Sequence, residues 1–208
     1  MPDIVWRTNA NQFGSFSVVF APDSKSVFSY GGDAKQWRVS DRSLLRTFVI
    51  PNQEVAAIAL SPDGARLVGW SANRGFRMWR VTDGAELYSS FASGASLAFS
   101  PMGNFIARGT FDGTVVLLPV NGEVIGGGTG SYDEIHSDSV NELAFSPDGS
   151  LLLTGSSDST AKLLRVDPSS RGVAQEFEHR LYVKSVSWCE QNRRTCVVSK
   201  TGIFQPVL

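Results

Sequence analysis

A short turn-forming segment recurs along the chain, and this repeat limits the possible folds more than any other feature. Each copy begins with a bulky apolar residue and leads into a polar tight turn, in which proline fixes φ and glycine, where present, accepts a positive φ. Neighbouring copies lie about 40 residues apart, a period typical of repeat architectures. Four clear copies and a weaker fifth, which lacks the proline, occupy residues 20–24, 60–64, 99–103, 145–149 and 188–192.

The residues around each turn predict four short antiparallel strands per repeat. In the second copy an apolar strand leads into the turn 60–64, and three more predicted strands follow at 65–70, 76–81 and 86–91. Strands this short, separated by turn signals every 8–12 residues, are typical of antiparallel sheets. No segment keeps an apolar period of 3.6 residues over several turns, so we expect essentially no helix. Four strands in about 40 residues correspond to one blade of a β-propeller.

The repeat resembles that of the WD-repeat (WD40-type) β-propeller family. The fourth copy carries the resemblance best, with His136, a Ser-Pro-Asp-Gly turn at 146–149 and Thr-Gly-Ser-Ser-Asp at 154–158. The tryptophan that ends the family's third strand is present as Trp37 and Trp79, but leucine replaces it in the third and fourth copies, and the aspartate that follows it is absent throughout. The resemblance implies an all-β propeller of four-stranded antiparallel blades.

Five periods fit the chain when its two ends are read together. We expect a single propeller domain over residues 1–208, in which residues 3–8 supply the fourth strand of the last blade and so close a five-bladed ring. Closure would remove the open sheet edges of a linear stack. A fragment or divergent chain that completes its ring with another subunit is the alternative. The expected blades are about 15–50, 54–92, 94–130, 138–178, and 182–208 plus 3–8.

The resemblance also implies a structural role for the two histidines, which each stand four residues before the first valine of a predicted strand. In the family this imidazole links a hydroxyl group to the carboxylate of a tight-turn aspartate. Leu164 would end such a network in the fourth copy. Two histidines in different repeats, without a third ligand, do not form a zinc site, and we expect no metal, cofactor or catalytic residue. The residues assigned to the structural role are His136, Thr154, Asp158 and His179.

Composition and charge argue against several classes of function. The formal net charge is −1 and the basic residues are scattered, so the chain lacks the basic surface that nucleic-acid binding requires. No apolar run approaches the ~18 residues of a membrane span, and the N-terminal residues have no leader pattern. We therefore expect a cytoplasmic protein without nucleic-acid or membrane partners.

The two cysteines are too few for a disulfide framework. Asn192 and Arg193 lie midway between Cys189 and Cys196, so a two-residue turn there would place the cysteines opposite each other. A cross-strand disulfide and two reduced strand residues both fit this pattern.

Aromatic and arginine residues gather in the loops expected at one end of the strands. Loops that join second to third strands, and fourth to first strands, emerge on the same side of a propeller. Rigidly held aromatic and arginine side chains commonly dominate binding to protein partners. The candidate partner-binding residues are Tyr30, Trp70, Arg74, Phe111, Tyr132, Arg180 and Tyr182.

These features predict a non-catalytic scaffold that presents one face of a propeller to a protein or peptide partner. The alternative is a carbohydrate-binding or carbohydrate-active propeller, since five-bladed rings of other families do such work. A glycosidase needs two carboxylates ~5–10 Å apart across a cleft. The acidic residues of this chain fall in predicted turns and strand ends, without an obvious inward-facing pair.

Overall fold

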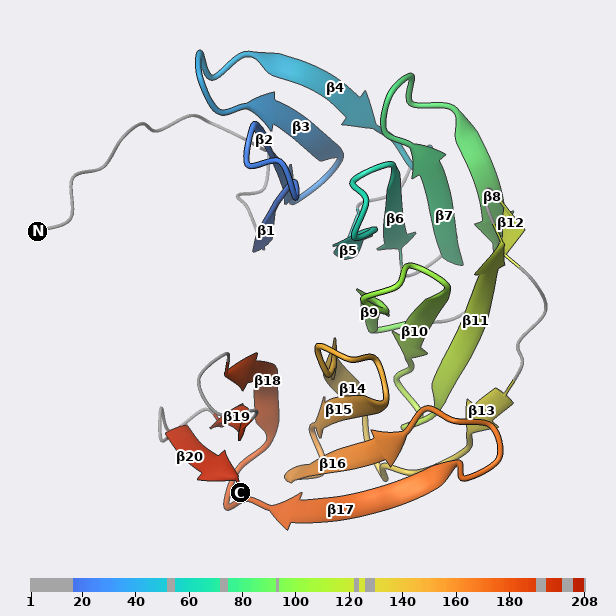
Figure 1. The fold of residues 1–208 in the computed structure, drawn as a ribbon, viewed down its shortest axis with the longest axis vertical. Coiled ribbons are helices and arrows are strands. Elements are labelled where there is room, and N and C mark those ends of the chain that lie inside the picture. Colours follow the sequence, from blue (N-terminus) through green and yellow to red (C-terminus); the bar gives the residue numbers. More distant parts are fainter. Residues whose placement is uncertain are drawn as a thin grey trace, which may run out of the picture. The chain divides into compact units, whose positions relative to one another are not determined.

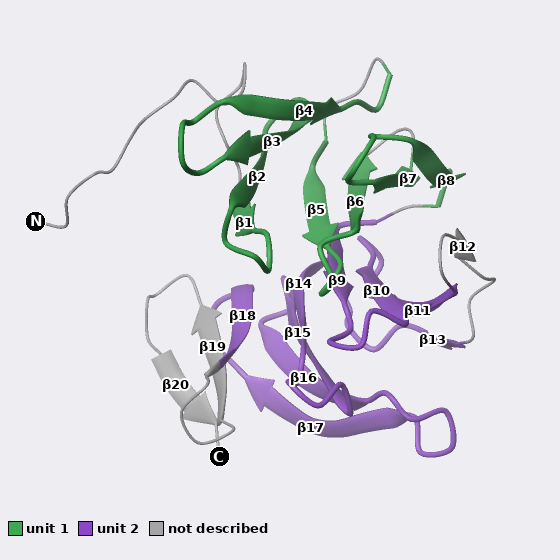
Figure 2. Ribbon diagram, turned by 45° about the horizontal axis from the view of Figure 1, so that its top comes forward, with its two compact units in different colours: residues 1–92 green, residues 93–208 purple. Residues whose placement is uncertain are grey.

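The computed structural model describes residues 17–51, 55–71, 75–92, 94–121, 124–125, 130–189, 194–199 and 204–207. These residues form strands β1 to β20 and no helix (Figure 1). Within these ranges, accordingly, no helix is long and apolar enough to cross a membrane. The chain divides into two compact units, residues 1–92 (unit 1) and residues 93–208 (unit 2) (Figure 2).

Unit 1 contains two four-stranded antiparallel sheets, each with its strands in chain order. The first sheet, blade 1, consists of β1 (Ser17–Phe20), β2 (Ser26–Tyr30), β3 (Ala34–Arg38) and β4 (Leu44–Phe48). The second sheet, blade 2, consists of β5 (Ala57–Leu60), β6 (Arg66–Ser71), β7 (Gly75–Arg80) and β8 (Glu86–Ser90). The recurring turn joins the first strand of each blade to the second, as the sequence predicts.

Unit 2 contains three further antiparallel sheets. Blade 3 consists of β9 (Ser96–Phe99), β10 (Phe105–Gly109), β11 (Val115–Asn121), β12 (Val124–Ile125) and β13 (Gly130–Tyr132), and both short strands pair with β11. Blade 4 consists of β14 (Val140–Phe145), β15 (Leu151–Ser156), β16 (Thr160–Arg165) and β17 (Gly172–Glu178). Blade 5 has three described strands, β18 (Val183–Cys189), β19 (Arg194–Ser199) and β20 (Phe204–Val207).

The side chains of the recurring turn explain why it is repeated. In blade 4, Ser146 Oγ donates to Asp148 Oδ1 over 2.6 Å and accepts from the backbone N–H of Leu151 over 2.9 Å. The N–H of Gly149, at φ +73°, donates to the Ser146 carbonyl and closes the turn. Ser61 and Asp63 make the equivalent bonds in blade 2. In blades 2 and 4, local chemistry therefore sets where the first strand ends and the second strand begins.

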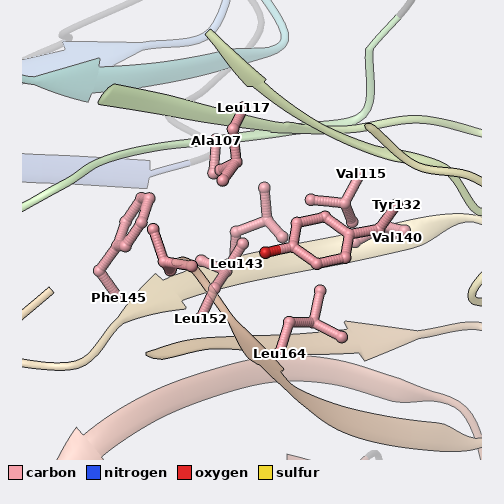
Figure 3. Close-up of a cluster of buried hydrophobic side chains, with 10 residues drawn as sticks. Ala107, Val115, Leu117, Tyr132, Val140, Leu143, Phe145, Leu152 and Leu164 are labelled. Atoms are coloured by element: carbon pink, nitrogen blue, oxygen red, sulfur yellow. The ribbon is translucent and has the colours of Figure 1, made fainter. Parts of the chain in front are cut away.

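Apolar clusters between neighbouring sheets hold each unit together. In unit 1, blades 1 and 2 enclose a cluster that includes Phe28, Phe48 and Trp79, with Phe48 between the other two rings. In unit 2, Leu152 and Leu164 of blade 4 lie in a cluster with Leu117 of blade 3 (Figure 3). Burying one such leucine stabilises the fold by about 1.5–3 kcal/mol relative to leaving it exposed.

The first strands of the three unit 2 blades are also joined by hydrogen bonds from side chains. Ser96 Oγ of blade 3 donates to the carbonyl of Val140 in blade 4 over 2.8 Å. Glu142 accepts from the N–H of Val186 in blade 5 over 3.0 Å, and Trp188 Nε1 donates to the carbonyl of Ala144 over 2.9 Å. These bonds satisfy backbone groups that the strand ladders leave open.

The predicted fold class, an all-β propeller built of four-stranded antiparallel blades, is confirmed. Blades 1, 2 and 4 have four strands in chain order, and the sheets follow the five repeats. Residues 3–8, to which the closing strand was assigned, lie outside the described residues, so closure stays a prediction.

The cysteine register corrects one prediction. β18 and β19 pair Cys189 with Arg194 and Cys196 with Ser187. The predicted two-residue turn at 192–193, which would place the two cysteines opposite each other, is therefore wrong. The physical reason is the strand register, because the pairing of Cys189 with Arg194 leaves the two cysteines two register positions apart.

Candidate functional site

His136 lies at the centre of a buried polar network in blade 4. The residue belongs to the loop between β13 and β14, and its Nδ1 is 2.9 Å from Asp158 Oδ2. Its Nε2 is 2.7 Å from the hydroxyl oxygen of Thr154 on β15. The structure thus brings together three of the four residues to which the sequence assigned a structural role.

Thr160 is a member of this network that the sequence analysis missed. Its N–H and hydroxyl both donate to Asp158 Oδ1, over 2.8 and 2.7 Å, and its hydroxyl oxygen is 3.0 Å from His136 Nδ1. The N–H of Ser137 donates to the other carboxylate oxygen over 3.1 Å. The sequence did contain a feature that could have identified Thr160, because it lies two residues after the turn aspartate Asp158. Thr114 lies at the same distance after Asp112 in blade 3 and donates its N–H to that carboxylate.

Burial and hydrogen bonding set the charges in the network. Burial lowers the pKa of His136 below its ordinary value of 6.5, although the Asp158 carboxylate opposes that shift. Burial alone would raise the pKa of Asp158, but hydrogen bonds from Thr160 and His136 keep it below its ordinary value. At neutral pH a neutral imidazole therefore donates from Nδ1 to a carboxylate, and Nε2 accepts the hydroxyl proton of Thr154.

This arrangement resembles a catalytic triad in composition but not in access. A nucleophile must reach its substrate, whereas Thr154 is 0% exposed and its hydroxyl also contacts the backbone carbonyl of Lys162 at 3.2 Å. His136 is likewise buried. The network therefore holds the loop before β14 against the turn between β15 and β16. With Thr154 fully buried, the geometry provides structural support and does not expose this hydroxyl as a nucleophile.

His179 does not have the equivalent network. Its backbone N–H donates to the carbonyl of Ser159, but within the described part of the chain its buried Nε2 has no hydrogen-bond partner. The register explains this difference, because Val197 faces Val186 where Thr154 faces Leu143, and valine has no hydroxyl. The assignment of His179 to a hydroxyl–imidazole–carboxylate network is therefore wrong for the described residues. Burial alone lowers its pKa.

Four loops of unit 2 form one connected surface, which we call the loop face: residues 110–114, 133–139, 157–159 and 179–182. The carbonyls of Thr110 and Gly113 accept from the second loop and the strand that follows it, and further backbone bonds link Ser157 to Ser139 and His179 to Ser159. Gly113, at φ +85°, allows the closest approach, because a Cβ there would lie 1.9 Å from the His136 carbonyl oxygen. These bonds hold all four loops at the same end of the strands.

A hollow of about 530 Å³ opens beside the histidine network. Its lining includes the carboxylates of Asp112, Glu134 and Glu176, together with Lys162, whose ammonium donates to the Ile135 carbonyl over 2.5 Å and lies 3.4 Å from Glu176. Among the described residues, no group of three or more His, Cys, Asp or Glu side chains is placed to hold a metal ion.

Three of the predicted partner-binding residues belong to the loop face. Phe111 is 57% exposed, Arg180 is exposed and Tyr182 is half-buried. Leu181, also exposed, is an addition that the sequence analysis missed, although an apolar residue between Arg180 and Tyr182 in a polar loop was the available signal. In unit 1, Tyr30 is half-buried against the core.

Two predicted surface residues are instead buried, and a third lies outside the described residues. Trp70 is 3% exposed because β6 holds it between Ala57 and Phe76 on the two neighbouring strands. Tyr132 is 5% exposed: its ring points into the unit 2 core, its hydroxyl donates to the Arg165 carbonyl, and Arg171 lies over the ring (Figure 3). Their assignment to a partner-binding surface is wrong. Arg74 is not among the described residues.

Comparison with known proteins supports the repeat assignment. A family model described as WD domain, G-beta repeat matches residues 91–117 and 129–164. The chain is also 30% identical over 107 residues to the Drosophila melanogaster protein named Protein groucho. That match covers 50% of this chain but only 15% of the relative, so the chain spans a small part of that protein's length.

Proposed function

We propose that this chain, two segments of which match a WD-repeat family model, is a non-catalytic scaffold that presents the unit 2 loop face to a protein or peptide partner. WD repeats generally serve protein–protein interaction, and the resemblance is strongest in blades 3 and 4, which supply three of the four loops. The loop face is therefore formed mainly by the part of the chain that the family model matches.

The observation that carries the proposal is a rigid loop surface with exposed anchors. Backbone hydrogen bonds connect the four loops, so side chains on them lose little conformational freedom on binding. Phe111, Arg180 and Leu181 project from this surface with much of their area exposed. Aromatic and arginine side chains of this kind are the commonest anchors of protein interfaces.

The experiment compares two double variants of the full chain in affinity purification from lysate, followed by direct binding of each captured protein. Phe111→Ala with Arg180→Ala removes two anchors of the loop face. Each hot-spot truncation typically costs about 2 kcal/mol or more, or roughly 30-fold in affinity, so capture should be lost. Thermal unfolding should change little, since surface substitutions usually cost within about 0.5 kcal/mol.

The matched control removes one apolar and one arginine side chain at the opposite ends of the unit 2 strands. Met102 lies in the turn before β10, Arg165 ends β16, and both are exposed. Met102→Ala with Arg165→Ala should leave the partner bound. Loss of the partner from this control alone would contradict the proposal. A glycan array gives an independent check, because oligosaccharide binding that depends on Phe111 and Arg180 would favour a carbohydrate-binding propeller instead.

A further inference from the structure

Blades 1 to 4 share one backbone bond, which joins the turn after the first strand to the end of the third strand or the turn that follows it. In each, a valine N–H donates to the carbonyl of a residue in the first turn. These bonds join Val39 to Lys25 over 2.9 Å, Val81 to Ala65 over 2.8 Å, Val120 to Asn104 over 2.8 Å and Val166 to Ser150 over 3.0 Å, in blades 1, 2, 3 and 4 respectively. Because the backbone bond is the same, differences between the blades reside in their side chains.

Blade 1 differs from the others at the left-handed positions of these turns. Ser24 has φ +57° where Gly64 and Gly149 have +70° and +73°. Arg42 has φ +66° in the second turn, where blade 2 has Gly84 at +77°. A residue with a Cβ is strained at such φ values and glycine is not, so these side chains persist at a conformational cost. Observed strain of this kind is a reason to look for a function.

The strained Ser24 lines a hollow of about 520 Å³ in blade 1. Lys25 and Arg38 also line it, and both are exposed. Arg38 bonds Asp41 through Nη1 over 2.8 Å, while the Lys25 ammonium has no partner among the described residues. Blade 2 has Ala65 at the position of Lys25, so it lacks this pairing of cations. The one carboxylate in the lining, Asp23, accepts the N–H of Lys25.

Hydroxyl groups complete the lining. Ser26 is only 7% exposed; its Oγ accepts from Gln36 Nε2 over 3.1 Å, and no acceptor for its own proton lies among the described residues. Ser24 and Ser40 carry exposed hydroxyls at the same hollow. Asp41 already pairs with Arg38, so among the described residues the Lys25 ammonium is the free cation of the hollow, and together with the serine hydroxyls it provides donors suited to an oxyanion. Val39 and Leu45 add apolar lining.

We propose that the blade 1 hollow binds a phosphate monoester carried by a peptide, that is, a phosphorylated serine or threonine side chain. The monoester carries about −1.5 to −2 charges at pH 7 and three acceptor oxygens, which match the Lys25 ammonium, the serine hydroxyls and the Arg38 guanidinium that Asp41 holds in place. The hollow is several times larger than a phosphate group, and its apolar residues suit the carbon atoms that bear the phosphate. The site shares no residue with the loop face, so the proposal does not rest on the proposed function.

Binding to the full chain is measured by calorimetry with three probes: N-acetyl-phosphoserine methylamide, its unphosphorylated counterpart and inorganic phosphate. The phosphorylated probe should bind most tightly and the unphosphorylated one not at all. Lys25→Gln should weaken binding about tenfold, the loss expected for one charge-assisted contact. The matched control is Arg80→Gln in blade 2, which breaks the equivalent ion pair with Asp83 but leaves the hollow untouched.

Ser24→Gly separates binding from stability. Glycine relieves the strain at φ +57°, so the thermal midpoint should rise, while loss of the hydroxyl should weaken phosphate binding several-fold. A merely structural Ser24 would change the midpoint without changing affinity. Equal affinity of wild type and Lys25→Gln, equal binding of the unphosphorylated probe, or binding of inorganic phosphate alone would each overturn the proposal.

Discussion

Blades 1 and 4 place a buried hydroxyl at the same register position but give it different partners. Ser29 faces Val18 in blade 1, and Thr154 faces Leu143 in blade 4, in each case two register positions before the last pair that precedes the turn. Trp37 Nε1 donates to Ser29 Oγ over 2.9 Å, whereas His136 Nε2 lies 2.7 Å from the Thr154 hydroxyl. One blade uses an indole on its third strand, and the other uses an imidazole from the loop before its first strand.

The difference shows that the hydroxyl is the shared element and that its partner can come from either side. Leu164 stands where blade 1 has Trp37, and as a fully buried leucine it contributes packing but no donor. A buried hydroxyl that lacks any partner destabilises the fold, but one good partner is enough. In blade 4, His136 therefore fills the role at the buried hydroxyl that Trp37 fills in blade 1.

The largest expected effect is that of His136→Ala. The substitution leaves the Thr154 hydroxyl without its imidazole partner, removes a hydrogen bond from Asp158 and opens space in a buried loop. We expect a loss of about 1–3 kcal/mol in the free energy of unfolding, measured by urea denaturation. Thr154→Val in the same background should add little, because the two residues act as one unit. A loss below about 0.5 kcal/mol, typical of a surface site, would contradict this account.

Trp37→Phe tests the other side of the comparison. It keeps most of the buried ring but removes the donor to Ser29, so we expect a loss of about 1 kcal/mol by the same measurement. Combining it with Ser29→Ala should cost less than the sum of the two single losses, since each substitution breaks the same bond. Strict additivity would show that the bond between Trp37 and Ser29 contributes nothing to stability.

Acid should weaken blade 4 more than blade 1, because only blade 4 uses an imidazole in its network. The pKa of His136 is lowered in the folded state, so the unfolded chain takes up the proton first. The stabilisation is thus fully present above about pH 7 and declines as the pH falls through and below 6.5, the ordinary value. Because His179 titrates in the same direction, the test is the difference between wild type and His136→Ala. That difference should shrink on acidification, and a constant difference would exclude the linkage.

Local chemistry made much of this structure predictable. The Ser-Pro-Asp-Gly turns are held by hydrogen bonds among their own residues. The strands that flank the turn at 146–149 could therefore be predicted from residue types alone. The resemblance to the WD-repeat family likewise implied a contact between His136 and Asp158, which the structure contains. Burial was harder to predict, because it depends on the neighbouring strands: Trp70 and Tyr132 stand at strand ends that the sequence shows as exposed loops. The prediction for His179 in the fifth repeat was wrong because of the strand register. Only the pairing of β18 with β19 shows that Val197 occupies the position that Thr154 has in blade 4.

The smallest expected effect is that of His179→Ala, which tests whether sequence position or hydrogen bonding decides the role of a histidine. His179 occupies the same place before β18 that His136 occupies before β14, but its ring has no hydrogen-bond partner among the described residues. Removing it breaks no side-chain bond and eliminates a buried polar atom, while its backbone bond to Ser159 is retained. We therefore expect the free energy of unfolding to change by no more than about 0.5 kcal/mol, in either direction. A loss comparable with that of His136→Ala would mean that His179 has a polar partner after all, and that the two histidines are equivalent.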